Sequence, residues 1–307
     1  MVQLNKKSNP YKRKDNRFFA IMMIWPIAHF LLFYVYINLN SFLLAFQKYD
    51  YGAGAFTWNG WNNFREVFYE LTHYPMLGIA FKNSAIAYVI GLLLTTPLTI
   101  LFGFYMYKKL IGHKFFKFML FLPSIISSIV VVIIFKYFVE RFIPEIVFLL
   151  TDHRMDGLLA NPQTSFATIL FYNIWIGFGG NILFYIGAMN RIPAEIVEAG
   201  KVDGLTLFGE FIHITLPLIY PTLTTIITCG VVGLFTNQLN LFTFFGTTAD
   251  YNIQTIGYYL FGNTLKSDET MYPFLSACGM LLTIIVAPIT FLVKFLMERF
   301  GPADVAF

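Results

Sequence analysis

One internal stretch of this largely apolar chain is rich in charged side chains. Residues 191–217 read RIPAEIVEAGKVDGLTLFGEFIHITLP. Six acidic or basic side chains fall within the first twenty residues of this stretch: Arg191, Glu195, Glu198, Lys201, Asp203 and Glu210. The chemistry that these residue types offer is ion pairing. Which elements present them depends on the rest of the chain.

The other long stretches are apolar. Of the 307 residues, 57% are hydrophobic and 12% are charged, whereas a soluble domain has about 25% charged residues. About 20 apolar residues cross a bilayer as a helix, because backbone groups in lipid must bond within their own segment. Six stretches meet this condition, at 18–46, 79–107, 116–139, 165–190, 218–245 and 271–297. The sequence therefore predicts an all-α integral membrane protein with six transmembrane helices.

Lys and Arg are distributed unequally between the loops. Fourteen of the 21 lie in the N-terminal tail, the loop between the second and third predicted spans, residues 191–217 and the C-terminal end. Cytoplasmic loops carry the excess of Lys and Arg, so both termini and the charged stretch are predicted to be cytoplasmic. The expected organisation is a basic tail at 1–17, a membrane domain at 18–297 and a cytoplasmic tail at 298–307.

Residues 191–217, called the insert from here on, are predicted to form two short helices joined by a glycine turn. Pro193 suits the first helical turn, and Gly204 can take the left-handed conformation that ends a helix. Ala199 and Gly200 lack bulk, so another surface can approach the backbone there. Composition alone leaves an ordinary amphipathic loop on the membrane surface as an equal alternative.

The order of residues in the insert resembles the cytoplasmic signature of inner-membrane permease subunits of binding-protein-dependent ABC importers. That pattern is E-A-A, three residues, G, nine residues, I, one residue and L-P. The matching residues are Glu198, Ala199, Gly200, Gly204, Ile214, Leu216 and Pro217. Gly200 stands in place of the second alanine, a change that can loosen the first helix.

Three further segments are similar to the carbohydrate-uptake branch, in particular to the first permease of maltose-type systems. They are GWNNF at 60–64, KNSAIAYVIGLLLTTPLTILFGF at 82–104 and FLPSIISSIVVVIIFKYFV at 121–139. The resemblance covers residues 18–297 and implies the ABC type I importer permease fold in a bacterial cytoplasmic (inner) membrane. It implies membrane lipid, a second permease in a heterodimer, a cytoplasmic ABC ATPase dimer and an extracytoplasmic solute-binding protein as partners, and no nucleic acid.

The resemblance also assigns a role to the insert, as the coupling helix that sits in a cleft of one ATPase subunit. The residues implied are Glu195, Glu198, Ala199, Gly200, Asp203 and Gly204. Glu198 would pair with a basic residue, and Gly204 would set the angle between the two helices. The sequence contains no G-x-x-x-x-G-K-[ST] motif, so we expect a transport subunit with no catalytic residue, metal site or cofactor of its own, and ATP and Mg in the partner ATPase.

Neutral polar and aromatic side chains in the last three predicted spans are candidates for a substrate pathway, because lipid disfavours the polar ones. The candidates are Asn173, Trp175, Asn181, Asn237, Gln238, Asn240, Phe244 and Tyr272. Asn237, Asn240 and Phe244 have the spacing to share one helix face. Amides can bond sugar hydroxyls and rings can stack on a pyranose, whereas hydrogen bonding between helices is the alternative role.

The middles of the predicted spans contain no Asp, Glu, Lys or Arg. Ion-coupled carriers commonly use intramembrane acids, so a permease for a sugar or oligosaccharide, driven by a partner ATPase, is the leading hypothesis. A permease of the same class for glycerol phosphate, a polyamine or phosphate is the alternative. An ion-coupled secondary carrier is less favoured.

Glu198→Lys is predicted to abolish coupling to the ATPase while leaving the chain folded. Breaking one partner of a buried ion pair at such an interface costs about 3–5 kcal/mol. The measurement is substrate-stimulated ATP hydrolysis by the purified complex, with assembly of the complex as the folding control. Normal stimulation by the variant complex would contradict the assignment of the insert.

Overall fold

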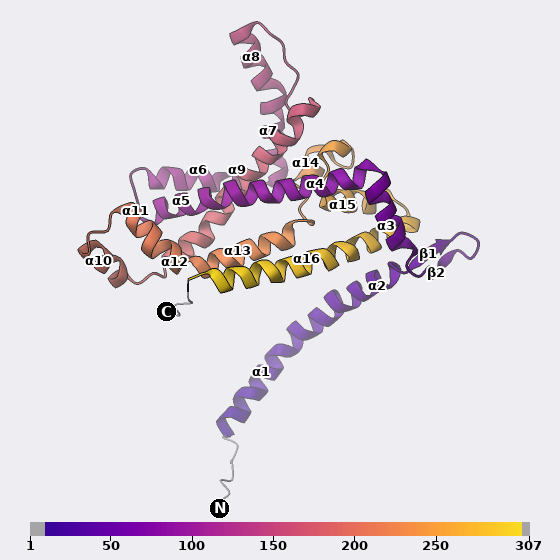
Figure 1. Ribbon diagram of the computed structural model, residues 1–307, viewed down its shortest axis with the longest axis horizontal. Helices are drawn as coiled ribbons and strands as arrows, with labels where there is room; N and C mark the ends of the chain where they lie inside the picture. The colour runs from indigo at the N-terminus through magenta and orange to yellow at the C-terminus, as the bar shows by residue number, and fades with distance from the viewer. Residues whose placement is uncertain (1–9, 303–307) are drawn as a thin grey trace, which may run out of the picture. The chain divides into compact units, whose positions relative to one another are not determined.

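The computed structural model describes residues 10–302, so the predicted tails at 1–17 and 298–307 lie partly outside the described residues. The described chain is helical, as predicted, apart from one short two-stranded antiparallel sheet (Figure 1). The chain divides into two compact units. The first comprises the residues up to Val67 together with Asp268–Met280, and the second comprises Phe68–Ser267 and the chain from Leu281 onward.

The first unit begins with one long helical run. Its segments are α1 (Pro10–His29), the π-helical η1 (Phe30–Tyr36) and α2 (Ile37–Leu44). Residues 18–44 have the length and composition of a membrane span, which agrees with the predicted span to within two residues. A hairpin of β1 (Gln47–Asp50) and β2 (Ala55–Trp58) follows, with Gln47 paired to Trp58.

Asn63 fastens this hairpin to the start of α3 (Asn62–His73). Its buried amide donates to the carbonyl oxygens of Ala45 at 2.8 Å and Gln47 at 2.7 Å. The ring of Phe46 lies beside the rings of Trp58, Trp61 and Phe64. The 3-10 turn η6 (Glu269–Met271) and the first turns of α16 (Tyr272–Phe300) complete the unit.

The second unit is built on long helices that pack along one another (Figure 1). α4 (Pro75–Ile90), the π-helical η2 (Gly91–Thr95) and α5 (Thr96–Tyr107) form one run of 33 residues. α9 (Pro162–Met189) packs along both α5 and α6 (His113–Ile125). At Gly179 the backbone of α9 comes so close to α6 that an added Cβ would overlap the carbonyl oxygen of Leu120.

The third predicted span, 116–139, is not one helix. α6 ends at Ile125, and α7 (Ser128–Tyr137) starts after a bend of 98°. Pro123 lacks a backbone donor, which weakens the last turn of α6. The helix then continues past the predicted end through η3 (Phe138–Phe142) and α8 (Ile143–Thr151).

The fifth predicted span, 218–245, also breaks. α13 (Tyr220–Gly233) ends twelve residues early, and Leu239 and Asn240 take left-handed backbone angles with φ of 49° and 57°. The side chain of Asn237 accepts a hydrogen bond from the backbone N–H of Leu239 at 2.8 Å. Such local bonding competes with the helix. The elements that follow are α14 (Leu241–Phe245), η5 (Tyr251–Ile253) and α15 (Ile256–Lys266).

Within residues 10–302, four helical runs are long and apolar enough to cross a membrane, or six if each bent pair counts as one span. The runs at 75–107, 162–189 and 269–300 match the second, fourth and sixth predicted spans, with both ends of each run within four residues of the predicted ends.

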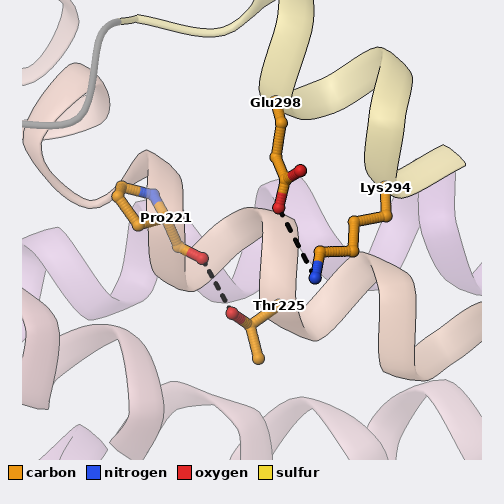
Figure 2. Close-up of polar contacts among 4 residues, drawn as sticks. All are labelled: Pro221, Thr225, Lys294 and Glu298. Carbon is orange, nitrogen blue, oxygen red and sulfur yellow. Dashed lines mark hydrogen bonds and ion pairs between the residues drawn. The ribbon is translucent and has the colours of Figure 1, made fainter. Parts of the chain in front are cut away.

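The last turns of α16 lie against the start of α13 (Figure 2). Tyr220 Oη donates to the Met297 carbonyl at 3.0 Å, and Gly301 leaves room for the Tyr220 ring. Figure 2 also shows the bond from the Thr225 hydroxyl to the Pro221 carbonyl at 2.9 Å and the exposed ion pair between Lys294 and Glu298 at 3.6 Å.

Gly179→Ala is predicted to destabilise the second unit, because its new methyl group must push the backbones of α6 and α9 apart. Overpacking of this kind costs about 1–3 kcal/mol. Gly180→Ala is the matched control: nothing lies within 4 Å of a Cβ there, and alanine is about 1 kcal/mol more favourable than glycine inside a helix. Thermal unfolding in detergent compares the two, and equal midpoints would contradict the close approach.

Candidate functional site: the insert and a cavity

The insert folds as the predicted helix, glycine turn and helix. α10 (Ala194–Val202) is followed by its C-cap Asp203 and then by Gly204, whose φ is +80°. The N–H of Leu205 bonds the Gly200 carbonyl at 2.9 Å, and that of Gly204 bonds the Lys201 carbonyl at 3.1 Å. This pair of bonds is the Schellman arrangement that stops a helix at a left-handed glycine. Pro193 stands at the N-cap rather than inside the first turn.

The second arm of the insert runs through three consecutive helical segments. They are α11 (Leu207–Glu210), the π-helical η4 (Phe211–Thr215) and α12 (Leu216–Leu218). The Thr206 hydroxyl caps this arm by accepting from the N–H of Gly209 at 3.1 Å. A bend of 65° then leads into α13. Gly204 therefore sets where one arm ends and the other begins.

Five of the six predicted insert residues lie on the surface: Glu195, Glu198, Ala199, Asp203 and Gly204. Gly200 is buried and faces its own chain. A Cβ at Gly200 would lie 2.6 Å from Cδ1 of Ile214 and 3.0 Å from Cδ1 of Leu205. The expectation that another surface approaches the backbone at Gly200 is therefore wrong, because the second arm of the insert already occupies that space. α10 runs through Gly200 without a break.

The inner face of the insert is apolar and packs on the ends of α5 and α9. Phe104 of α5 and Phe211 of the insert have ring centroids 5.0 Å apart. One buried cluster holds all three parts together: Ile100, Phe104, Tyr185, Met189, Ile192, Val197, Phe211, Ile214 and Ile219. The insert is therefore a packed extension of these helices and not a loose loop on the membrane surface.

Glu210 is the one acidic residue of the insert that is buried, with 4% of its surface exposed. Its carboxylate pairs with the ammonium group of Lys108, which directly follows α5. Both residues lie in predicted cytoplasmic loops, and no sequence pattern pairs them. The ion pair puts those two loops at the same end of the helices.

The second unit contains a cavity of about 660 Å³ between the α4–η2–α5 run, α9 and α13. Three predicted pathway residues line it: Asn173, Asn181 and Asn237. Most of its other polar lining consists of hydroxyl groups outside the set predicted from the sequence: Ser84, Tyr88, Thr95, Thr96, Thr222, Thr225 and Thr255. The signal for some of them was available, since TTP at 95–97 and PTLTT at 221–225 put hydroxyls in apolar stretches.

Asn173 is held by hydrogen bonds within the protein. Its Nδ2 donates to the carbonyls of Ile169 and Leu239, each at 2.9 Å, and its Oδ1 accepts from Asn240 Nδ2 at 2.8 Å. The alternative weighed for these residues, hydrogen bonding between segments, is thus what Asn173 and Asn240 do. This network holds the cavity wall beside Leu239 in place.

The remaining pathway candidates do not line the cavity. Trp175 is partly exposed and lies beside Phe135, and Phe244 is buried in the core around Tyr172. Gln238 is half-buried, and Tyr272 belongs to the first unit. The expected helix face shared by Asn237, Asn240 and Phe244 does not exist, because α13 ends before Asn237 and α14 begins after Asn240.

Comparison with known proteins gives related sequences over most of this chain. Residues 95–303 match the family described as binding-protein-dependent transport system inner membrane component. The arabinooligosaccharides transport system permease protein AraP of Bacillus subtilis (strain 168) is 26% identical over 265 residues, which are 85% of this chain and 82% of that protein. The lactose transport system permease protein LacF of Rhizobium radiobacter is 25% identical over 89% of this chain and 88% of that protein.

Two further comparisons concern a larger relative and a solved structure. The maltose/maltodextrin transport system permease protein MalF of Escherichia coli (strain K12) is 28% identical over 58% of this chain and 35% of that protein. A chain in the crystal structure of a bacterial ABC transporter involved in the import of the acidic polysaccharide alginate superposes with a TM-score of 0.77. The match covers 94% of this chain and 98% of that one at 20% identity, which shows a shared fold.

Gly204→Val is predicted to destabilise the insert through its backbone and not through a clash. No atom of the described structure lies within 4 Å of a Cβ at this position, but a left-handed backbone costs a residue with a Cβ about 1–2 kcal/mol. Gly204→Asn is the matched control, because asparagine tolerates this conformation better. Thermal unfolding in detergent is the measurement, and equal losses for Val and Asn would argue against backbone strain as the cause.

Proposed function

Because this chain belongs to the family of inner membrane components of binding-protein-dependent transport systems, we propose that it is a permease subunit of an ABC importer for a sugar or oligosaccharide. It forms half of the translocation pathway, an extracytoplasmic binding protein delivers the substrate, and a partner ATPase supplies the energy. Members of this family are transport subunits and not enzymes. The bacterial cytoplasmic membrane is its location, with both termini and the insert on the cytoplasmic side.

The observation that carries the proposal is the insert. Its outer surface carries exposed acidic side chains, including Glu195 and Glu198, and the exposed apolar side chains of Val202 and Phe208, which are 88% and 71% exposed. Apolar anchors with charged neighbours are typical of a protein-binding surface. The ATPase is the partner expected for a member of this family, and basic residues in its cleft would pair with Glu198.

Packing of the insert explains how a movement at this surface reaches the helices. The buried cluster around Phe104, Tyr185 and Phe211 joins the insert to α5 and α9, and close-packed interiors transmit displacement because they compress little. The insert also continues directly into α13 through the bend at Ile219. Since η2–α5, α9 and α13 all line the cavity, a shift of the docked insert would change the cavity wall.

Support for a sugar substrate comes from the relatives and from the cavity. The similar permeases are named for arabinooligosaccharides, lactose and maltodextrins. The described lining of the cavity offers amide and hydroxyl groups together with the ring of Phe184, which suits a neutral polyhydroxy compound. A second permease, in a heterodimer, would complete the pathway.

Uptake by a reconstituted complex tests the proposal. The chain, its second permease and the ATPase pair are placed in liposomes with the binding protein, and ATP-dependent uptake is measured for arabinooligosaccharides, lactose and maltodextrins. Glycerol 3-phosphate, spermidine and phosphate are the comparison solutes. We expect ATP-dependent uptake of at least one saccharide and none with Glu198→Lys. Uptake confined to the comparison solutes would overturn the sugar assignment, and uptake without ATP would overturn the importer assignment.

A further inference from the structure

The ion pair between Lys108 and Glu210 is far more buried than the pair between Lys294 and Glu298. The side chains of Lys108 and Glu210 are only 14% and 5% exposed, whereas those of Lys294 and Glu298 are 54% and 59% exposed. The Lys108 ammonium also lies 5.2 Å from the ring centre of Tyr107 and 5.7 Å from that of Phe104. The cation is therefore held between two aromatic rings and a carboxylate.

A charge buried in this way is costly unless its partner stays in place. Lys108 and Glu210 therefore resist separation more strongly than an exposed pair, which solvent and salt screen. Apolar contacts such as that of Phe104 with Phe211 resist compression, but they are non-directional and so do not hold the two surfaces in register against sliding. The ion pair fixes one point on the insert to one point at the end of α5.

The position of this fixed point matters because of how the chain is connected. α9 enters the insert directly and α13 leaves it directly, so the backbone itself carries movement to both. α5 has no such link, because α6 to α9 separate it from the insert along the chain. Only contacts through space can move α5 together with the insert.

α5 and the π-helical η2 before it form one wall of the cavity, through Gly91, Leu92, Thr95 and Thr96. π-helical turns within α-helices are often found at functional sites. A pull on the Lys108 end of α5 therefore acts along the helix on the segment that lines the cavity.

We propose that Lys108 and Glu210 are positioning residues that make the η2–α5 wall of the cavity follow the insert when the ATPase moves it. This role rests on the proposed function, since it needs an insert that the ATPase displaces. The pair carries the movement to the η2–α5 wall of the cavity, which does not adjoin the insert along the backbone.

Two cysteine reporters separate the two routes. Native Cys229 lines the cavity from α13, which follows the insert along the backbone. Thr96→Cys, made in a Cys229→Ser chain, lines the cavity from α5. The complete complex with its second permease and ATPase pair is treated with a maleimide, first without nucleotide and then trapped with ATP and vanadate. Peptide mass spectrometry assigns the labelled cysteine and gives its labelling rate.

Three changes are made in each reporter background: Glu210→Gln, Lys108→Gln and the exchange Lys108→Glu with Glu210→Lys. The exchange Lys294→Glu with Glu298→Lys reverses the exposed pair shown in Figure 2 and is the matched control. In the parent complex we expect nucleotide to change both labelling rates. Either Gln variant should reduce the nucleotide effect at position 96 by roughly fivefold or more and leave the effect at Cys229, while both exchanges should behave as the parent.

Several results would overturn the inference. Gln variants that keep the nucleotide effect at position 96 would show that α5 follows the insert without the pair, and loss of the effect at both reporters would show a general structural role. If the Gln variants do not assemble, the Lys108–Glu210 exchange decides alone, and an assembled exchange without the effect at position 96 contradicts the inference. A parent complex in which neither reporter responds to nucleotide would instead overturn the proposed function.

Discussion

Apolar packing of the insert against the ends of α5 and α9 is the constraint on which the rest of this structure depends. α10 has nine residues and α11 only four, and isolated helices of this length are marginal in water. Their stability must come from burying the inner face, with Val197, Phe211 and Ile214 in one cluster with Phe104 and Tyr185. The same burial holds the outer face of the insert in a fixed orientation, which is what a docking surface needs.

Glycine shows how one residue type serves different physical purposes in this fold. Gly204 is needed for its left-handed backbone, and space around it is open. Gly200 is needed because Ile214 occupies the place of a side chain, and Gly179 because α6 approaches α9 there. The signature spacing links Gly200 to Ile214 in the sequence, and the structure gives the reason: the two positions are in contact across the turn.

The hydrogen-bond partners of polar side chains in apolar stretches cannot be read from the sequence. Asn83 of α4 donates to the carbonyls of Asn252 at 2.8 Å and Gln254 at 2.9 Å, and Ser84 accepts from the N–H of Ile256 at 3.0 Å. These partners lie about 170 residues away along the chain, so no local pattern reveals them. The sequence predicts Asn173 and Asn240 as pathway residues, but in the structure their side chains bond to each other, and Asn173 also bonds to the carbonyls of Ile169 and Leu239. Buried amides must be paired somewhere, and only the fold decides with what.

The sequence by itself determined the helical membrane architecture, the approximate ends of four spans, and the helix–turn–helix form of the insert. These features follow from local composition and spacing. The length of an apolar stretch determines whether it can span a membrane, and a glycine that takes the left-handed conformation, as Gly204 does, ends a helix. The break after α6 and the unwinding before Asn240 also have local causes, in Pro123 and in the hydrogen bond between the Asn237 side chain and the Leu239 N–H. Tertiary structure alone decided the lining of the cavity and the pairing of Lys108 with Glu210, because each depends on groups distant in the chain meeting in space.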